Sequence, residues 1–431
     1  MKNYTFVIKF TCLLIVVVLL REYYLSITTF PNLESEVSLY ETFGISDWLI
    51  NYRGGFVRRG LAGEVLWLLY QIHPYNVVYV IIGITAISLI ALTALCVILF
   101  RRMGWPLWIL LFPMFLYSSY YGLGGQLGFR RDTLLLLLSY LLFWQYKKYV
   151  KGGGISRFCL LSIWILSILI ILLHEGVIFS IFPFLVLHTF VINNTSATRA
   201  AKNLLLLWFP SAITLVAVIS FHGNDNISEL IWKSWMPCFM AYPYSDSIPP
   251  IGLGPSFLSS SFSDGYNLAK ELTWKPYFIA CIPAWPFNIY LFIAFYYLFT
   301  RMGIMSIRNK RRIPDHVQMS NIFLFQLVFT TPMLGIIGCD WFRSIPICCI
   351  TSCFLCFLFP EHQNVPAIIN RFSEWIQRII GKSYCLGSSW VYYIVLISLP
   401  FCHHCARPGG MFPFIPLDLK GKLLETVMEW I

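Results

Sequence analysis

The stretch Val77–Phe100, VVYVIIGITAISLIALTALCVILF, contains no charged residue. About 20 apolar residues in an α-helix span the hydrocarbon core of a bilayer. The whole chain has the same character, since 58% of its 431 residues are apolar, 12% are charged and the mean hydropathy is +0.70. A soluble domain carries about 25% charged residues. This composition excludes a soluble enzyme, a secreted disulfide scaffold and a disordered chain, and it predicts a membrane protein built of helices.

Ten further apolar stretches predict an all-α, polytopic transmembrane helical bundle of about eleven helices (roughly nine to thirteen). The expected spans are 6–26, 77–100, 105–121, 133–146, 158–173, 177–192, 203–221, 277–299, 320–339, 345–360 and 388–404. Several are shorter than a bilayer requires, so these spans must include flanking residues or re-enter the membrane.

The segments between the spans complete one membrane domain, 1–431, with long outer loops at 27–76 and 222–276. The first loop contains an amphipathic stretch from Leu61 to Ile72. The outer C-terminal tail, 405–431, is expected to lie partly on the membrane surface as an amphipathic helix. No small-residue cleavage site follows the N-terminal apolar run, so we expect an uncleaved first helix.

The net charge of +11 is explained by orientation. With a cytoplasmic N-terminus, 18 of the 31 Lys and Arg residues fall in cytoplasmic segments, and 17 of the 20 Asp and Glu residues fall outside. An excess of Lys and Arg in short cytoplasmic loops is typical of membrane proteins. The positive charge therefore predicts topology, and no nucleic-acid partner is expected.

The thirteen cysteines lie mostly in apolar runs, where cysteine behaves as a small buried apolar side chain. The one metal-like cluster is Cys402-His403-His404-Cys405. Its spacing matches no usual zinc pattern, and no second pair of ligands lies nearby in the sequence. We therefore assign no metal site.

Four clusters of ionisable residues fall at the outer ends of expected helices. They are Asp47-Trp48 with Asn51-Tyr52-Arg53-Gly54-Gly55-Phe56-Val57-Arg58-Arg59-Gly60, Gly128-Phe129-Arg130-Arg131-Asp132, His174-Glu175-Gly176 and Asp340-Trp341-Phe342-Arg343. Each has a structural alternative, such as an anchor to lipid phosphate, an ion pair at a helix start or a polar turn. An ionisable side chain at the membrane edge costs free energy of desolvation, so such residues are candidates for a functional site. Since all four lie on one face, we expect a shared site.

These residue types suit a lipid-linked diphosphate sugar. Arginine binds phosphate through paired hydrogen bonds and stays charged near lipid. The expected substrate-binding residues are Arg53, Arg58, Arg59, Arg130, Arg131, Asp132 and Arg343. The expected catalytic residues are Asp47, His174, Glu175 and Asp340, one of which would deprotonate an acceptor hydroxyl. A divalent metal is compatible with the carboxylates but is not demanded.

The same motifs resemble those of bacterial polytopic membrane proteins associated with surface polysaccharide clusters. The layout is similar to O-antigen or capsule repeat-unit polymerases and to multi-helix glycosyltransferases that use lipid-linked sugars. The resemblance implies glycosidic bond formation at the outer face of the bacterial inner membrane, with a polyprenyl-diphosphate-linked saccharide as donor. In the glycosyltransferases an acidic residue of the first outer loop is typically catalytic, and Asp47 is the nearest match. In the polymerases outer-loop arginines are the typical functional residues, which Arg53, Arg58 and Arg59 match.

We therefore expect a surface-polysaccharide polymerase or glycosyltransferase whose partners are the lipid-linked saccharide, membrane lipids and polysaccharide assembly proteins. Two other classes stay open. A transporter or flippase for a lipid-linked saccharide or anion would carry charges deep within helices and repeated halves. A non-enzymatic partner in envelope assembly would tolerate single replacements of the outer carboxylates and arginines.

Overall fold

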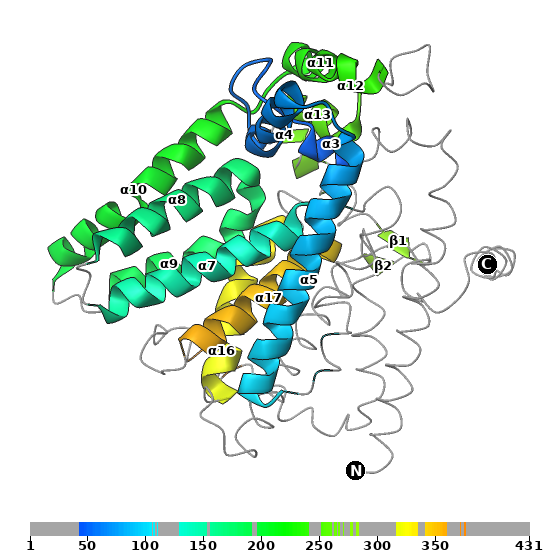
Figure 1. Ribbon diagram of the computed structural model, residues 1–431. Coiled ribbons are helices and arrows are strands. Elements are labelled where there is room, and N and C mark those ends of the chain that lie inside the picture. The colour runs from blue at the N-terminus through cyan, green and yellow to red at the C-terminus, as the bar shows by residue number, and fades with distance from the viewer. Residues whose placement is uncertain are drawn as a thin grey trace, which may run out of the picture. The chain divides into compact units, whose positions relative to one another are not determined.

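The computed structural model describes residues 43–105, 129–152, 156–191, 196–240, 251–260, 316–334 and 341–359, with a few more at 107–110, 263–283 and 371–375. Helices dominate this part of the chain. They are α3 (Phe43–Trp48), α4 (Gly60–Ile72), α5 (Val77–Met103), α7 (Asp132–Lys151), α8 (Arg157–Leu173), η4 (Glu175–Val177), α9 (Ile178–Val191), α10 (Ala197–Ser220), α11 (Asp225–Ser234), α12 (Met236–Met240), α13 (Leu253–Ser256), η5 (Phe257–Ser259), α16 (His316–Thr330), η6 (Thr331–Leu334) and α17 (Trp341–Leu358) (Figure 1).

Helices occupy seven of the expected spans. These spans are 77–100, 133–146, 158–173, 177–192, 203–221, 320–339 and 345–360. The short span at 133–146 includes flanking residues and forms the 20-residue helix α7, as expected from the length that a bilayer requires. Among the described residues, two helices, α5 and α10, are long and apolar enough to cross a membrane. The spans at 6–26 and 388–404 lie outside the described residues, as does nearly all of 105–121.

The first residues of the helix expected at 277–299 are not helical, and residues 284–299 lie outside the described residues. Two short antiparallel strands, β1 (Pro276–Phe278) and β2 (Ile282–Pro283), occupy the first part of this range. Proline lacks a backbone N–H and opposes the α conformation in the residue before it. Apolarity alone therefore predicted the wrong local structure for these residues.

The chain divides into two compact units, which are described separately. The first unit comprises Tyr23–Cys96 and Ser119–Asp264. The second unit comprises Met1–Glu22, Val97–Ser118 and Gly265–Ile431. In the second unit, α16 packs against α17, and η6 contacts both helices. The single membrane domain expected from the sequence stays a prediction.

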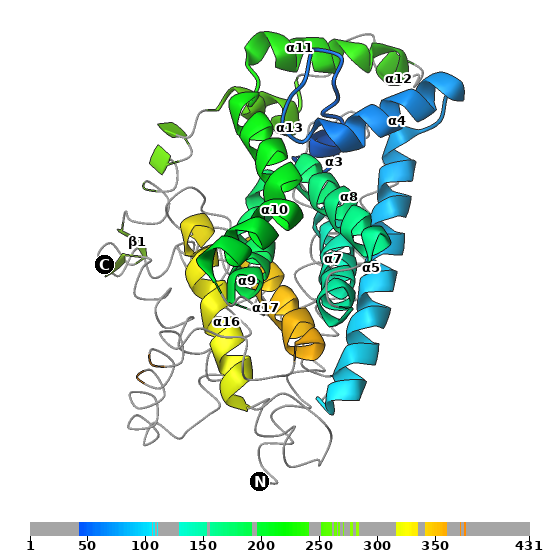
Figure 2. The same ribbon diagram turned by 90° about the vertical axis from the view of Figure 1, so that its left-hand side faces the viewer.

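In the first unit, α7, α8, α9 and α10 form a bundle (Figure 2). A buried polar network lies inside it. The Tyr146 hydroxyl is 2.9 Å from both His188 Nδ1 and Thr189 Oγ1, and Trp208 Nε1 donates to Thr189 Oγ1 at 3.1 Å. Polar side chains between apolar helices hold them in register, because an unmade hydrogen bond in an apolar surrounding is costly.

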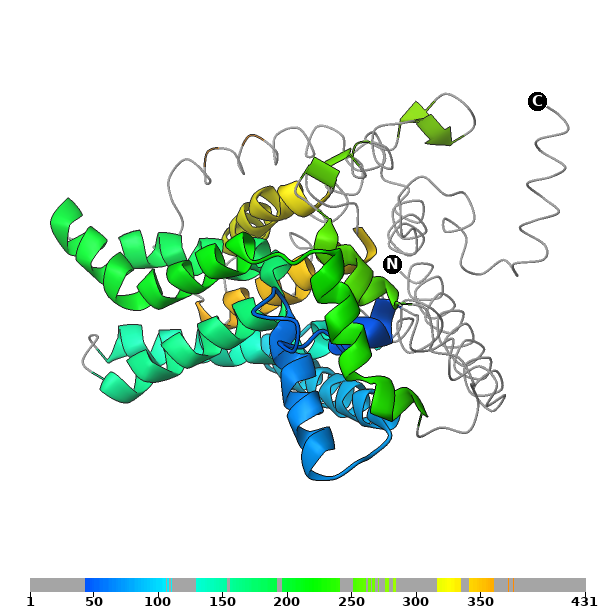
Figure 3. The same cartoon turned by 90° about the horizontal axis from the view of Figure 1, so that it is seen from above.

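The two long loops expected at 27–76 and 222–276 contain short helices that pack together over one end of this bundle (Figure 3). Trp235 Nε1 donates to Leu49 O at 2.8 Å, and Gly254 N donates to the Ser46 hydroxyl at 2.8 Å. A small apolar core seals the contact between them. It contains Ile50, Val57, Ile231 and Leu258, with Tyr52 and Ile227 packed against it. Residues of the second long loop, about 200 positions later in the sequence, therefore lie beside the first charged motif.

Candidate functional site

Five charged side chains from the predicted motifs meet at one end of the helices of the first unit. We call Asp47, Arg58, Arg59, Arg131 and Glu175 the arginine–carboxylate cluster. Asp47 is on α3, the two adjacent arginines immediately precede α4, Arg131 precedes α7, and Glu175 begins η4 directly after α8. The structure thus brings together charged residues from three of the four motifs, and their shared function stays a prediction.

The Asp47–Arg131 pair forms the buried layer of the cluster. Their side chains are 3% and 0% exposed. Arg131 Nε donates to Asp47 Oδ2 at 3.0 Å, and Nη2 lies 2.5 Å from the same oxygen. Arg131 Nη1 also donates to the backbone carbonyl of Arg59 at 2.9 Å. One buried guanidinium therefore fixes both the carboxylate of α3 and the backbone that enters α4.

The Arg59–Glu175 pair forms the accessible layer, with both side chains 18% exposed. Arg59 Nε lies 3.0 Å from each carboxylate oxygen, and Nη2 donates to Oε1 at 2.6 Å. Arg59 Nη1 lies 3.7 Å from Asp47 Oδ1. Arg59 therefore links the two carboxylates and the two layers.

Arg58 is the arginine least committed to a carboxylate. Its Nη1 lies 3.9 Å from Glu175 Oε1, whereas Nη2 donates to the carbonyl of Phe257 at 2.6 Å. The side chain is 21% exposed, and its buried Nε has no hydrogen-bond partner among the described residues. Burial and the adjacent Arg59 cation lower the pKa of Arg58. Arg58 is thus held mainly by backbone carbonyls and only loosely by Glu175.

Backbone geometry at the cluster is unusual for the residue types present. Arg59 and Phe129 both have φ of 63°, in the left-handed region. Such a conformation costs a non-glycine residue of order 1–3 kcal/mol and is enriched at functional sites. Trp48 Nε1 donates to Phe129 O at 2.7 Å, and the Arg131 guanidinium lies 5.9 Å from the centre of the Trp48 ring. The backbone carbonyl of Phe129 is thus held by Trp48, and that of Arg59 by Arg131.

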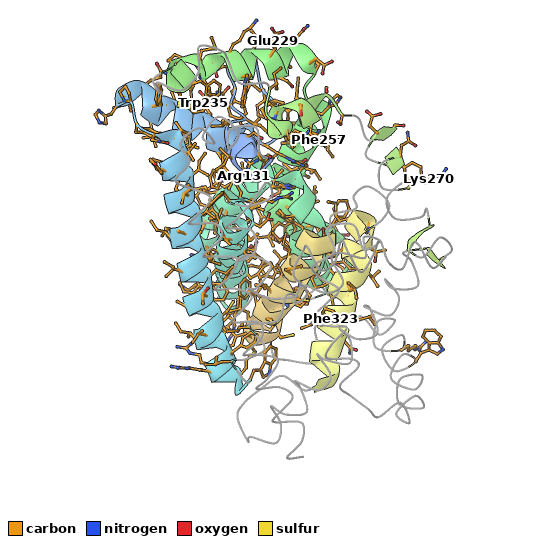
Figure 4. The ribbon with its side chains drawn as sticks, turned by 90° about the vertical axis from the view of Figure 1, so that its right-hand side faces the viewer. Arg131, Glu229, Trp235, Phe257, Lys270 and Phe323 are labelled. Atoms are coloured by element: carbon orange, nitrogen blue, oxygen red, sulfur yellow. The ribbon has the colours of Figure 1, made fainter. Side chains whose placement is uncertain are left out.

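The three guanidinium groups and two carboxylates give the cluster a formal charge of +1. In Figure 4, Arg131 lies below Trp235 and Phe257, whose segments cover this end of the unit. The cluster thus combines a buried ion pair with two partly exposed arginines, and guanidinium groups are the side chains that bind phosphate through paired hydrogen bonds.

The carboxylates are better placed to orient arginines than to accept protons. Burial raises the pKa of Glu175, but the charge and hydrogen bonds of Arg59, with a smaller effect of Arg58, outweigh burial and lower this pKa to about 2. A general base works best with a pKa near the operating pH. Asp47 is buried and paired with Arg131. The geometry therefore favours a positioning role for both carboxylates.

The side chain of His174 also has a structural role. Its Nδ1 accepts a hydrogen bond from Gly176 N at 3.0 Å and caps η4, and its ring is buried. Because the lone pair on Nδ1 is engaged, the neutral ring carries its proton on Nε2, where it is a donor. In this arrangement His174 is better suited to donate a hydrogen bond than to accept a proton.

Arg53 is placed away from the cluster, although it belongs to the same sequence motif. It forms an ion pair with Glu64 and lies 4.0 Å from the centre of the Trp67 ring. Tyr52 also contacts this carboxylate, because its backbone N–H donates to Glu64 at 3.0 Å. Burial and Glu64 raise the pKa of Tyr52 to about 12. Glu64 was missed by the sequence analysis, since it occurs within an apolar helical pattern rather than a charged motif.

The remaining predicted residues are described only in part. Arg130 and Asp132 flank Arg131 at the start of α7, where an acidic residue in the first turn is favoured by the helix dipole. Asp340 lies outside the described residues, and only the backbone of Arg343, in α17, is described. Their shared role with the cluster stays a prediction.

The sequence analysis also missed the residues that hold Arg58. Its backbone N–H donates to Phe221 O at 3.0 Å, and its guanidinium contacts the carbonyls of Phe257 and Ser260. Backbone acceptors have no residue-type signature, so no motif could have revealed them.

Within the described part of the chain, no three His, Cys, Asp or Glu residues lie close enough together to hold a metal ion. Comparisons of the chain with models of protein families, with curated proteins and with solved structures found no match.

Proposed function

We propose that this chain is a multi-pass enzyme of surface-polysaccharide synthesis in the bacterial inner membrane. Its substrate is a polyprenyl-diphosphate-linked saccharide, and its reaction is glycosidic bond formation at the outer face. The observation that supports this most directly is the gathering of three arginines and two carboxylates from distant motifs into one cluster with excess positive charge.

The accessible arginines suit the diphosphate of this substrate. Arg58 and Arg59 are adjacent and partly exposed, and Arg58 has a buried donor without a partner among the described residues. In the reaction, the acceptor oxygen bonds to the anomeric carbon, the bond from that carbon to the diphosphate breaks, and the proton of the acceptor hydroxyl passes to the departing diphosphate. Negative charge then grows on the diphosphate, and fixed guanidinium groups stabilise such charge best where water is scarce.

The location of the cluster also suits a lipid-linked substrate. It lies where α7 begins and α8 ends, in the same unit as most of the long apolar helix α5. A polyprenyl tail would remain in the hydrocarbon beside such helices, and its diphosphate would reach the level of the helix ends. In this proposal Arg131, Asp47 and Glu175 position the two binding arginines.

The test compares Arg58→Ala with Arg53→Ala in the strain that carries the gene. Both arginines belong to one motif, but only Arg58 is in the cluster, so Arg53→Ala is the matched control. We expect Arg58→Ala to abolish long surface glycan and Arg53→Ala to leave it near normal. Membrane levels of each variant are measured by immunoblotting.

The glycan that remains identifies the step. Single repeat units without long chains indicate a polymerase, and loss of all repeat units indicates an earlier glycosyltransferase. Wild-type glycan from Arg58→Ala, at normal protein level, would contradict the proposal. Arg58→Lys keeps the charge but not the planar fork, so it should restore activity only in part.

A further inference from the structure

Helix α4 has an apolar face that no described residue covers. Val65, Leu68, Leu69 and Ile72 are 49%, 48%, 48% and 81% exposed. Their spacing of three and four residues places them in one stripe along the helix. The stripe contains no charged residue. Such a row of aliphatic side chains in water is unfavourable, so a partner is expected.

The packing of α4 determines which way this stripe faces. Residues about 100° apart around a helix put Trp67 and Tyr70 on the side opposite the stripe. Trp67 Nε1 donates to Ser234 O of α11 at 3.4 Å, and the Tyr70 ring lies 6.3 Å from that of Trp235 at the end of α11. The stripe therefore faces away from α11.

The long helices of this unit extend on the side opposite α11. Figure 2 shows α4 running across the end of α5, with α11 beyond it, and Figure 3 shows α4 lengthwise from above. Only residues 73–76 separate α4 from α5, which begins at Val77. The exposed side chains of α5 are also aliphatic, as at Ile87 and Ile90. The stripe thus lies close in sequence to a helix that is long and apolar enough to cross a membrane and that exposes aliphatic side chains of its own.

We propose that α4 is an interfacial helix whose aliphatic stripe inserts into the lipid bilayer, at the boundary between headgroups and acyl chains. A helix with one apolar and one polar face lies in the plane of this boundary, with its apolar side a few ångströms deep. The face opposite the stripe packs against α11. The polar residues of α4 flank the stripe: Gln71 is exposed, and Glu64 is paired with Arg53. Because α4 begins directly after Arg59, this anchorage holds the arginine–carboxylate cluster at headgroup level.

The test uses the purified full chain in phospholipid nanodiscs that contain a small fraction of phosphatidylcholine with a photoreactive diazirine near the glycerol. After illumination, labelled peptides are mapped by mass spectrometry. We expect labels on α4 between Val65 and Ile72 and on α5. Leu230 of α11 is the matched control, since it is 51% exposed but belongs to a helix on the far side of α4. It should stay unlabelled.

A second sample carries Leu68→Glu and Leu69→Glu together. Labelling of α4 should fall several-fold while that of α5 is unchanged, which also shows that the chain is still folded in the bilayer. Labelled α5 with unlabelled α4 in the wild-type chain would overturn the proposal. Equal labelling of α4 and α11 would also overturn it. The readout needs no substrate, so it is independent of the proposed function.

Discussion

The ion pair between Glu175 and Arg59 makes the stability of the fold depend on pH. The Arg59 pair holds its pKa at about 2, below the ordinary 4.5. A carboxyl whose pKa is depressed in the folded state stabilises the fold above its unfolded pKa, and this contribution is lost as pH falls through the folded pKa. The amount at stake is about 3 kcal/mol.

We therefore expect the melting temperature of the detergent-solubilised chain to fall as pH is lowered from about 4.5 toward 2. Glu175→Gln should be less stable at neutral pH and should show a weaker dependence over this range. Melting curves at a series of pH values give the comparison. Identical pH dependence in the two proteins would mean that Glu175 is not the responsible group.

Arg131 illustrates a buried charge that depends on its partner. Removing one member of a buried pair typically costs about 3–5 kcal/mol, because the other charge stays buried. We expect Arg131→Met alone to be strongly destabilising, and Asp47→Asn combined with Arg131→Met to cost clearly less than the sum of the single changes. Denaturant unfolding of the four proteins measures this coupling. Additivity within about 0.5 kcal/mol would refute it.

At the scale of elements, close packing of α4 against the segment before it depends on a residue without a side chain. A Cβ on Gly63 would lie 2.1 Å from the Ile50 carbonyl oxygen and 2.8 Å from the Trp48 carbonyl oxygen. Both are backbone atoms that cannot turn away. A Cβ on Gly83, in α5, would meet no heavy atom within 4 Å.

Gly63→Ala should therefore destabilise the chain by about 1–3 kcal/mol, the usual cost of overpacking. Gly83→Ala is the control, and it should be neutral or slightly stabilising because alanine favours helix. Unfolding in detergent distinguishes the two variants. Equal stability of the two would show that α4 can move away from Ile50 without cost.

The starting points of three helices are explained by the residue that precedes each of them. Helices α8, α10 and α11 begin after Ser156, Ser196 and Asn224, whose side chains accept from backbone N–H groups of the first turn. These residue types are preferred at that position. The strands at 276–283 did not follow, because apolar runs do not distinguish a helix from a short strand.

At the scale of the molecule, the sorting of charges predicts which loops face the cytoplasm. The α7–α8 connection follows Lys147, Lys148 and Lys151, and the α10–α11 connection lies between Phe221 and Asn224. The excess of Lys near the first connection indicates the cytoplasmic side.

A fluorescent-protein fusion truncated after Gly152 should therefore fluoresce, and an alkaline phosphatase fusion at that position should be inactive. Fusions truncated after His222 should behave in the opposite way. Fluorescence and phosphatase activity in cells are the measurements. The reverse pattern would invert the predicted orientation.

The sequence alone determined the helical class and most helix positions, and it predicted a set of charged residues of which the structure brings five together, namely Asp47, Arg58, Arg59, Arg131 and Glu175. Apolar run length and charge placement depend on local composition, so one sequence suffices for them. The tertiary structure decided that Arg53 pairs with Glu64 outside the cluster, and that Arg131 is buried while Arg58 is accessible. The pairing and burial of each arginine depend on which residue lies beside its guanidinium group in the folded chain. Contacts between distant residues, and contacts with backbone carbonyls, cannot be recognised from residue types in one sequence.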